Sequence, residues 1–156
     1  KMAEIEKKLK FTLIGYGKEK KTVNELINKS RIKHKFNILD KVNYKNLPQY
    51  LIKSNLLLLT SYYEGFGRVI LEAMSFGLPC VSTKSGGPQD LIIDGFNGFI
   101  VKSRNSKEVA EKCIEIIKER KNYINMSKNS LSLAEEKYSF EKLSSNFIDL
   151  LLEKDT

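Results

Sequence analysis

Residues 55–83 read NLLLLTSYYEGFGRVILEAMSFGLPCVST and hold a strand, a loop, a helix and a second strand in that order. The leucine run predicts a strand at Leu56–Thr60 that is buried on both faces. Apolar side chains then recur with a helical period over Phe66–Phe76, and a glycine and a proline end that helix. The next strand is predicted at Cys80–Ser82. Two strands joined by a helix favour parallel pairing.

The same alternation continues on both sides of this stretch. Further strands are predicted at Phe11–Gly15, Phe36–Leu39 and Phe99–Val101, and further helices at Glu19–Asn28, Leu47–Lys53 and Pro88–Ile93. Beyond these the chain is predicted to be helical. Ser106 and Ser139 are the expected N-caps there, and the buried face of the last helix is expected to hold Phe140, Leu143, Phe147 and Leu151. The predicted fold class is α/β, a parallel sheet flanked by helices with a helical C-terminal tail.

Composition narrows the class of protein. A length of 156 residues suits one ordinary domain or part of a larger enzyme. Two cysteines and one histidine are too few for a disulfide framework or a zinc cluster, which favours a reducing compartment. The longest apolar run, Leu56–Leu59, is far shorter than the roughly 20 residues of a membrane-spanning helix. The net charge of +8 is best explained by a solvated, lysine-rich surface, although a surface for polyanions stays open.

Two glycine-rich junctions follow predicted strands, where parallel sheets bind their ligands. The first, Gly15-Tyr16-Gly17, imitates a dinucleotide-binding loop, with Asp40 at the end of the next strand. The third glycine of that fingerprint is replaced by Lys20, so a simple tight turn is the favoured interpretation.

The second junction, Glu64-Gly65-Phe66-Gly67, opens the helix that contains Glu72. A carboxylate at the edge of the buried stripe suits the paired hydroxyls of a ribose or hexose. The amides of residues 66–69 lie at the positive end of the helix dipole, which suits a diphosphate. A plain surface ion pair between Arg68 and Glu72 explains the spacing equally well, so both interpretations stay open.

The stretch from Thr60 to Thr83, followed by Gly86-Gly87-Pro88 and then Asp94 to Phe99, resembles retaining glycosyltransferases of GT-B fold, of the group-four, glycogen-synthase-like kind. The likeness rests on the two glutamates separated by seven residues and on the later Asp-Gly-x-x-Gly. Gly15-x-Gly17 and the segment Tyr138-Ser139-Phe140-Glu141 match more loosely. The resemblance spans roughly residues 10 to 145 and implies the Rossmann-like C-terminal half of a GT-B fold.

This resemblance implies a nucleotide-sugar donor site. Glu64 would be the catalytic residue and hold the transferred sugar, and Glu72 would hold the ribose hydroxyls. Val42 would flank the base, Gly15 would border the nucleotide, and two glycines at 86 and 87 would shape the rim. The full donor-binding set is Gly15, Val42, Glu64, Gly65, Phe66, Gly67, Arg68, Val69 and Glu72.

The resemblance also sets expectations for the whole protein. Residues 1–156 would be a single nucleotide-sugar binding domain, an N-terminally truncated fragment of a larger two-domain enzyme. The acceptor-binding domain and a basic pair that grips the diphosphate would precede residue 1, so the fragment alone should be inactive. We expect a cytoplasmic hexosyltransferase that uses a UDP-sugar, no metal and no further cofactor, with a glycan or glycolipid acceptor. Nucleic acid is not an expected partner, and peripheral contact with the inner membrane surface stays open.

Two rival functions remain. One is a glycosidase that uses Glu64 and Glu72 as acid and base, although glycines at a helix entry serve that chemistry poorly. The other is a basic, non-catalytic module that docks on nucleic acid or an anionic membrane.

Overall fold

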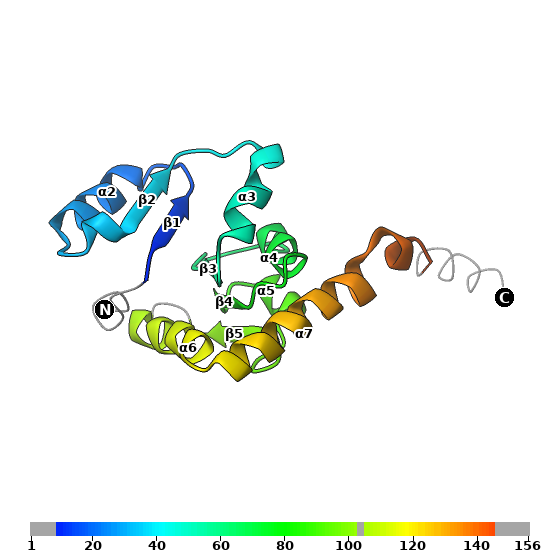
Figure 1. Ribbon diagram of the computed structural model, residues 1–156. Helices are drawn as coiled ribbons and strands as arrows, with labels where there is room; N and C mark the ends of the chain where they lie inside the picture. Colours follow the sequence, from blue (N-terminus) through cyan, green and yellow to red (C-terminus); the bar gives the residue numbers. More distant parts are fainter. Residues whose placement is uncertain (1–8, 103–104, 146–156) are drawn as a thin grey trace. The chain divides into compact units, whose positions relative to one another are not determined.

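The computed structural model describes residues 9–102 and 105–145, which form a parallel α/β protein (Figure 1). The chain divides into two compact units, the first ending at Lys53 and the second beginning at Ser54. Among the described residues the strands form two separate sheets, one in each unit. The predicted α/β class, with parallel pairing and flanking helices, is therefore confirmed.

The first unit is a two-stranded parallel sheet with one crossover helix. Strands β1 (Phe11–Ile14) and β2 (Phe36–Leu39) pair in parallel, and α2 (Lys20–Lys29) and a 3-10 turn, η1 (Lys33–Lys35), connect them. The rings of Phe11 and Phe36 stack with centroids 4.9 Å apart. After β2 the chain enters η2 (Tyr44–Asn46) and α3 (Leu47–Ile52). These bounds lie close to the predicted ones because each apolar segment is delimited by polar or glycine residues.

The second unit contains a three-stranded parallel sheet. Its order is β3 (Leu57–Leu59), β4 (Cys80–Thr83) and β5 (Gly98–Val101). All four residues of the central strand are buried. The prediction that the leucine strand is buried on both faces is wrong, since Leu58 is 40% exposed. The reason is that β3 is an edge strand of this sheet. A leucine run predicts a strand but not its place in the strand order.

Helix α4 (Arg68–Met74) follows β3 and is shorter than predicted. Gly67 precedes it with a φ of 89°, a left-handed conformation that favours glycine. At the other end, Gly77 has a φ of 67°, and its amide donates to Met74 O while the next amide, of Leu78, donates to Ala73 O. This pair of bonds is a Schellman motif, which confirms that Gly77 ends the helix. A short helix, α5 (Pro88–Leu91), follows β4.

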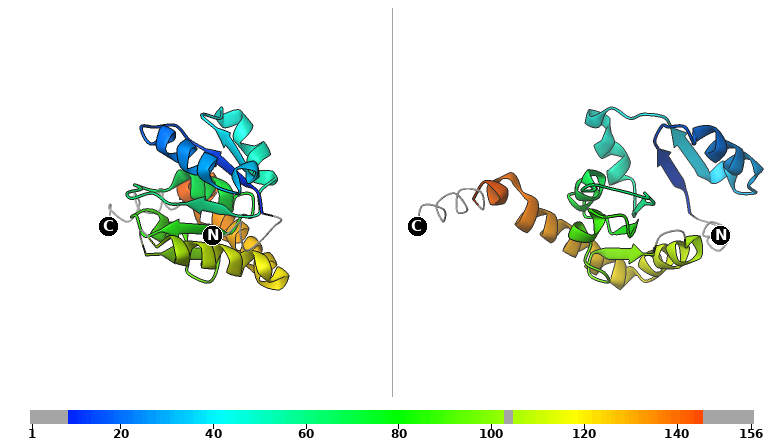
Figure 2. Two further views of the ribbon diagram at one scale, coloured as in Figure 1. Left: turned by 90° about the vertical axis from the view of Figure 1, so that its left-hand side faces the viewer. Right: turned by 180° about the vertical axis from the view of Figure 1, so that it is seen from behind.

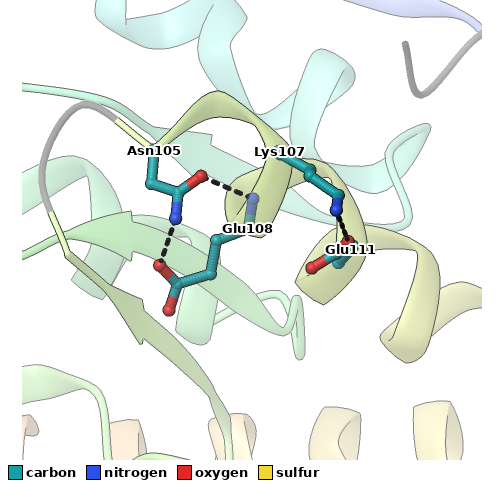
Figure 3. A network of polar contacts seen from close by, with 4 residues as sticks. All are labelled: Asn105, Lys107, Glu108 and Glu111. Carbon is teal, nitrogen blue, oxygen red and sulfur yellow. Dashed lines mark hydrogen bonds and ion pairs between the residues drawn. The ribbon is translucent and has the colours of Figure 1, made fainter.

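Two longer helices complete the second unit. Helix α6 (Ser106–Lys118) packs on β4 and β5, and α7 (Arg120–Tyr138) contacts both α6 and α4 (Figure 2). The predicted cap of α6 is wrong by one residue. The side chain of Asn105 accepts a hydrogen bond from the amide of Glu108 at 3.1 Å and donates to the Glu108 carboxylate at 3.1 Å (Figure 3). Ser106 is therefore the first helical residue.

The prediction for the C-terminal segment holds in part. Ser139 Oγ accepts from the amide of Lys142 at 3.3 Å, so Ser139 does cap a helical turn that begins at residue 140. The expected buried face is wrong at its start, because Phe140 is 81% exposed and Leu143 is also exposed. The other two residues predicted for that face, Phe147 and Leu151, lie outside the described residues.

Candidate functional site

The loops that follow β3 and β4 lie side by side at the carboxyl ends of these neighbouring strands. The amide of Glu64 donates to Ser85 O at 2.9 Å, and the amide of Gly87 donates back to Glu64 O at 2.8 Å. The Thr83 hydroxyl also donates to Ser61 O at 2.6 Å. The backbone around Glu64 is thus fixed by the neighbouring strand and not only by its own loop.

Two glycines allow this close approach. Gly86 has a φ of 112°, and a Cβ there would lie 2.8 Å from Glu64 O. A Cβ on Gly87 would lie 2.3 Å from the Cα of Phe66 and 2.5 Å from Gly65 O, distances that no side chain tolerates. Within the described chain these glycines are therefore required by the packing of one loop against the other.

Glu64 is half-buried and its carboxylate lies at the N-terminus of α4. The Oε1 atom accepts a hydrogen bond from the amide of Gly67 at 3.2 Å. A carboxylate is favourable at this end of a helix because the helix dipole places partial positive charge there. The sequence-based expectation that the Gly67 amide is free for a phosphate is consequently wrong in this structure, where that amide is used by Glu64.

Glu72 lies in the second turn of α4, and its side chain is 21% exposed. Arg68 Nη2 lies 3.9 Å from Glu72 Oε1, while the Arg68 side chain is 80% exposed. An exposed pair at this distance is worth at most a few tenths of a kcal/mol, roughly 0.3–0.5 for i,i+4 pairs. The predicted ion pair between Arg68 and Glu72 is present. Its contribution to stability is too small to account for the partial burial of the Glu72 carboxylate.

The remaining predicted residues of the donor set lie around these two glutamates or in the first unit. Gly65, Phe66 and Val69 belong to the loop and first turn that join Glu64 to Glu72. Gly15 and Val42 belong to the first unit, directly after β1 and shortly after β2. The amide of Gly15 donates to Leu39 O at 3.0 Å, which continues the β1–β2 ladder.

The structure accounts for the incomplete dinucleotide fingerprint of the first unit. Lys20, which replaces its third glycine, forms an ion pair and a hydrogen bond with the carboxylate of Asp40. In a dinucleotide site that carboxylate would accept ribose hydroxyls. Here the ammonium of Lys20 binds that carboxylate, which counts against a dinucleotide site. The turn comes later than predicted, at residues 17–20, where the Lys20 amide donates to Gly17 O at 3.2 Å.

The Asp-Gly-x-x-Gly motif proves to be a structural turn. Asp94 Oδ1 accepts from the amide of Ile100 at 2.9 Å, and a Cβ on Gly98 would lie 1.9 Å from Cys80 O. Between them Asn97 is fully buried, accepting from the Ile93 amide at 2.8 Å and donating to Leu91 O at 3.1 Å. Sequence reasoning named the motif but missed Asn97, whose only signal was its position between the two glycines.

The sequence also offered no indication of the contacts of Tyr138, which belongs only to a loosely matching segment. Its hydroxyl donates to the main-chain oxygen of Asp90 at 3.0 Å, and its ring meets that of Phe66 edge-on at a centroid distance of 6.4 Å. Tyr62 and Tyr63, which directly precede Glu64, are both exposed. The aromatic residue that does contact the loop comes from the distant end of α7.

No group of three or more histidine, cysteine or acidic residues is arranged in the described part of the chain so as to hold a metal ion. No helix described here combines the length and the apolar character that crossing a membrane requires.

Comparison with known proteins identifies the family of the chain. The family model described as "Glycosyl transferases group 1" matches residues 1–132. The N-acetyl-alpha-D-glucosaminyl L-malate synthase of Bacillus anthracis is 32% identical over 138 residues, which cover 88% of this chain and 36% of the relative. The chain therefore spans little more than a third of that protein's length.

Solved structures agree. Alr3699/HepE of Anabaena in complex with UDP has a TM-score of 0.82 and 26% identity over 93% of this chain and 41% of that protein. The C-terminal domain of the group 1 glycosyl transferase LpcC of Francisella tularensis has a TM-score of 0.79 and 22% identity over 89% of this chain and 74% of that domain, a likeness of fold. By the match over residues 1–132 and by these relatives, the chain belongs to the group 1 glycosyl transferase family.

Proposed function

We propose that this chain is the nucleotide-sugar binding domain of a retaining hexosyltransferase, and that UDP-sugars are its donors. The observation that carries the proposal is the position of Glu64, whose carboxylate lies at the N-terminus of α4 between two loops packed against each other through glycines. The UDP complex of the Anabaena relative supports UDP as the nucleotide.

In this proposal Glu64 lies beside the anomeric carbon of the donor. When the bond from that carbon to the phosphate oxygen breaks, positive charge develops on the sugar and negative charge on the departing diphosphate. The Glu64 carboxylate stabilises the former by electrostatic attraction. Its hydrogen bond from the Gly67 amide holds the carboxylate in this orientation. Because configuration is retained without a covalent glycosyl-enzyme intermediate, an acceptor hydroxyl attacks the anomeric carbon on the face that the diphosphate leaves. The new C–O bond forms as the old one breaks, and the hydroxyl proton passes to the departing phosphate oxygen.

The departing diphosphate meets the amides of the same loop. Phe66, Arg68 and Val69 present these amides at the positive end of α4. The carboxylate of Glu72 accepts the two ribose hydroxyls, a role that its partial burial allows. Because the helix end stabilises the anion, no divalent metal is needed.

The acceptor is a glycan or glycolipid, bound by a part of the full-length protein outside these residues. The chain matches little more than a third of the length of the Bacillus anthracis relative, which supports an acceptor site in another part of the full-length protein. Residues 1–156 then act as one donor-binding domain. Alone they bind donor weakly and do not turn over.

A calorimetric titration with UDP, GDP and ADP, followed by UDP-glucose and UDP-N-acetylglucosamine, tests the proposal. We expect heat from the uridine nucleotides that disappears in the variant Glu72→Ala. Binding of none of the five compounds would overturn the proposal.

The charge distribution favours one alternative. Residues 1–53 hold 14 lysines and arginines against five acidic residues, whereas residues 54–156 hold 13 against 14. An exposed basic segment begins at the last residue of α2 and consists of Lys29, Arg31, Lys33 and His34. This favours a basic module that docks on nucleic acid or anionic lipid.

The two functions separate in one experiment. Binding to vesicles containing phosphatidylglycerol, or to random DNA, is measured in 50 and 200 mM salt, where a docking module would lose affinity steeply. The variant Lys29→Gln/Arg31→Gln/Lys33→Gln is compared with Lys118→Gln/Arg120→Gln/Lys121→Gln, which removes the same charge from the second unit. Strong, salt-sensitive binding lost only in the first variant, without any UDP binding, would favour the module.

A further inference from the structure

Tyr138 connects the end of α7 to both sides of the candidate site. Its hydroxyl donates to Asp90 O in α5 at 3.0 Å, across 48 residues of sequence. Its ring packs edge-on against Phe66, with a centroid distance of 6.4 Å and an interplanar angle of 69°. Phe66 lies between the two glycines that join Glu64 to α4. One side chain thus contacts both the loop after β3 and the helix after β4.

A chain of hydrogen bonds leads from Tyr138 to Glu64. The Tyr138 hydroxyl donates to Asp90 O at 3.0 Å, the Asp90 amide donates to Gly87 O at 3.0 Å, and the Gly87 amide donates to Glu64 O at 2.8 Å. On the other side, Phe66 stands next to Gly67, whose amide holds the Glu64 carboxylate. The backbone of Glu64 is therefore three hydrogen bonds from Tyr138, and its carboxylate is two contacts away.

The local structure keeps Tyr138 in this position. It is the last residue of α7, and the backbone of Ser139 turns to an extended conformation (φ −64°, ψ 153°) before the next helical turn begins. Partial burial and the negative charge of Asp90 raise the pKa of Tyr138, so its hydroxyl stays protonated and able to donate at neutral pH.

We propose that Tyr138 is a positioning residue of the donor site, holding Glu64 and the Gly65–Gly67 loop in their binding geometry through Asp90 and Phe66. The role in donor binding rests on the proposed function, whereas the ordering of the two loops does not. Tyr138 touches neither donor nor acceptor. Its effect is to hold the two loops in one conformation before the nucleotide binds, so that less conformational entropy is lost on binding.

The test separates the hydroxyl from the ring. Tyr138→Phe keeps the contact with Phe66 and removes the bond to Asp90, and Tyr138→Leu removes both. Tyr123→Phe is the matched control, because Tyr123 lies on the same helix about 22 Å away at 1.5 Å per residue. Two quantities are measured on the 156-residue chain well below its melting temperature: the Kd for UDP by calorimetry, and amide hydrogen exchange at Gly87 by NMR. The Gly95 amide, which bonds Gly98 O, is the internal reference for exchange.

We expect Tyr138→Phe to raise the Kd for UDP about fivefold, the effect of one lost hydrogen bond, and to speed exchange at Gly87 by a similar factor. Tyr138→Leu should show larger changes in both, and Tyr123→Phe none. A purely structural tyrosine would lower the melting temperature and leave Kd and Gly87 exchange unchanged, which would overturn the proposal. If Tyr138→Leu does not fold, Tyr138→Phe decides.

Failure of the proposed function has a different signature. If the wild-type chain binds no UDP while Gly87 exchange still rises in Tyr138→Phe, the nucleotide assignment falls and the ordering of the loops by Tyr138 stands. If UDP binds and neither variant alters Kd or exchange, the positioning role falls and the nucleotide assignment stands.

Discussion

The main-chain amide of Gly87 donates a hydrogen bond to the carbonyl oxygen of Glu64 at 2.8 Å, which joins the loop after β4 to the loop after β3. In the opposite direction, the amide of Glu64 donates a hydrogen bond to Ser85 O. This arrangement resembles one further step of the β3–β4 ladder, beyond the end of the regular strands. The backbone of Glu64 is therefore held through both its amide and its carbonyl oxygen, as it would be within a strand.

Replacing Gly87 by alanine should therefore damage both stability and binding. The added Cβ would fall 2.3 Å from the Cα of Phe66, so backbone must move. We expect a loss of about 1–3 kcal/mol in the free energy of unfolding, as for other overpacked sites, and loss of UDP binding. Urea denaturation and calorimetry measure the two effects. Gly17→Ala is the control, since its Cβ meets nothing within 4 Å. Wild-type behaviour of Gly87→Ala would contradict the packing described here.

Removal of the Glu72 carboxylate should affect binding and not folding. With UDP at 100 times its Kd, binding stabilises the wild-type chain by about 2.7 kcal/mol. For a domain of this size the melting temperature should then rise by roughly 5–10 °C. We expect Glu72→Ala to lose this rise while its melting temperature without ligand changes little.

Glu111→Ala is the matched control for Glu72→Ala. Both carboxylates belong to i,i+4 pairs of similar length, 3.9 Å for Arg68–Glu72 and 3.8 Å for Lys107–Glu111. The two pairs share their spacing, their order along the helix and nearly the same length, although Glu72 is 21% and Glu111 60% exposed. A difference in UDP protection between the variants therefore reports the contribution of Glu72 to the ligand and not the loss of an i,i+4 ion pair. Equal protection of both variants by UDP would remove Glu72 from the site.

Much of the fold was predictable because local signals agree with it. Apolar runs delimited by polar residues and glycines located the five strands of the described residues to within one residue at each end. The errors arise where the deciding interaction is not local. Leu58 is exposed because of strand order, and Asn105 caps α6 in place of the adjacent Ser106 because two residues with the same capping ability compete for one position.

The sequence predicts which segment holds the candidate site but not the contacts within it. The spacing of Glu64 and Glu72 around a helix entry is visible in the chain itself. The hydrogen bond from Gly67 to Glu64 was missed, since the sequence does not show how the carboxylate turns. The contact of Tyr138 with Phe66 spans 72 residues and follows from the packing of α7, which no local pattern reveals.

The buried side chain of Asn97 should contribute more to the free energy of unfolding than the exposed N-cap residue Asn105. Asn97→Ala leaves the Ile93 amide and Leu91 O, both bonded to the buried side chain, without these partners. Unsatisfied buried groups cost about 1–3 kcal/mol each, so we expect a loss of roughly 2–4 kcal/mol in urea denaturation. Asn105→Ala, which removes the cap of α6, should cost about 1 kcal/mol. A smaller effect at Asn97 than at Asn105 would show that the turn is not held by this side chain.

The two cysteines should be inert in the folded chain. Cys80 and Cys113 are buried, and burial raises the pKa of both thiols, that of Cys113 to about 12. Because only the thiolate is an effective nucleophile, neither should react with an aromatic disulfide reagent at pH 8, whereas two thiols per chain should react in guanidinium chloride. Ser106→Cys, an exposed thiol, is the control and should react at once.

The same pKa shifts predict how stability responds to alkaline pH. The unfolded thiols ionise near the ordinary value of 9.0, well below the folded ones. Between these values the folded state binds more protons than the unfolded state, so the free energy of unfolding falls as pH rises. The contribution of the thiols is therefore complete below pH 9 and is lost progressively towards pH 12. A Cys113→Ala variant should show a shallower decline in melting temperature over pH 9 to 11 than the wild-type chain. An identical decline would mean that Cys113 ionises as readily in the folded chain as in the unfolded one.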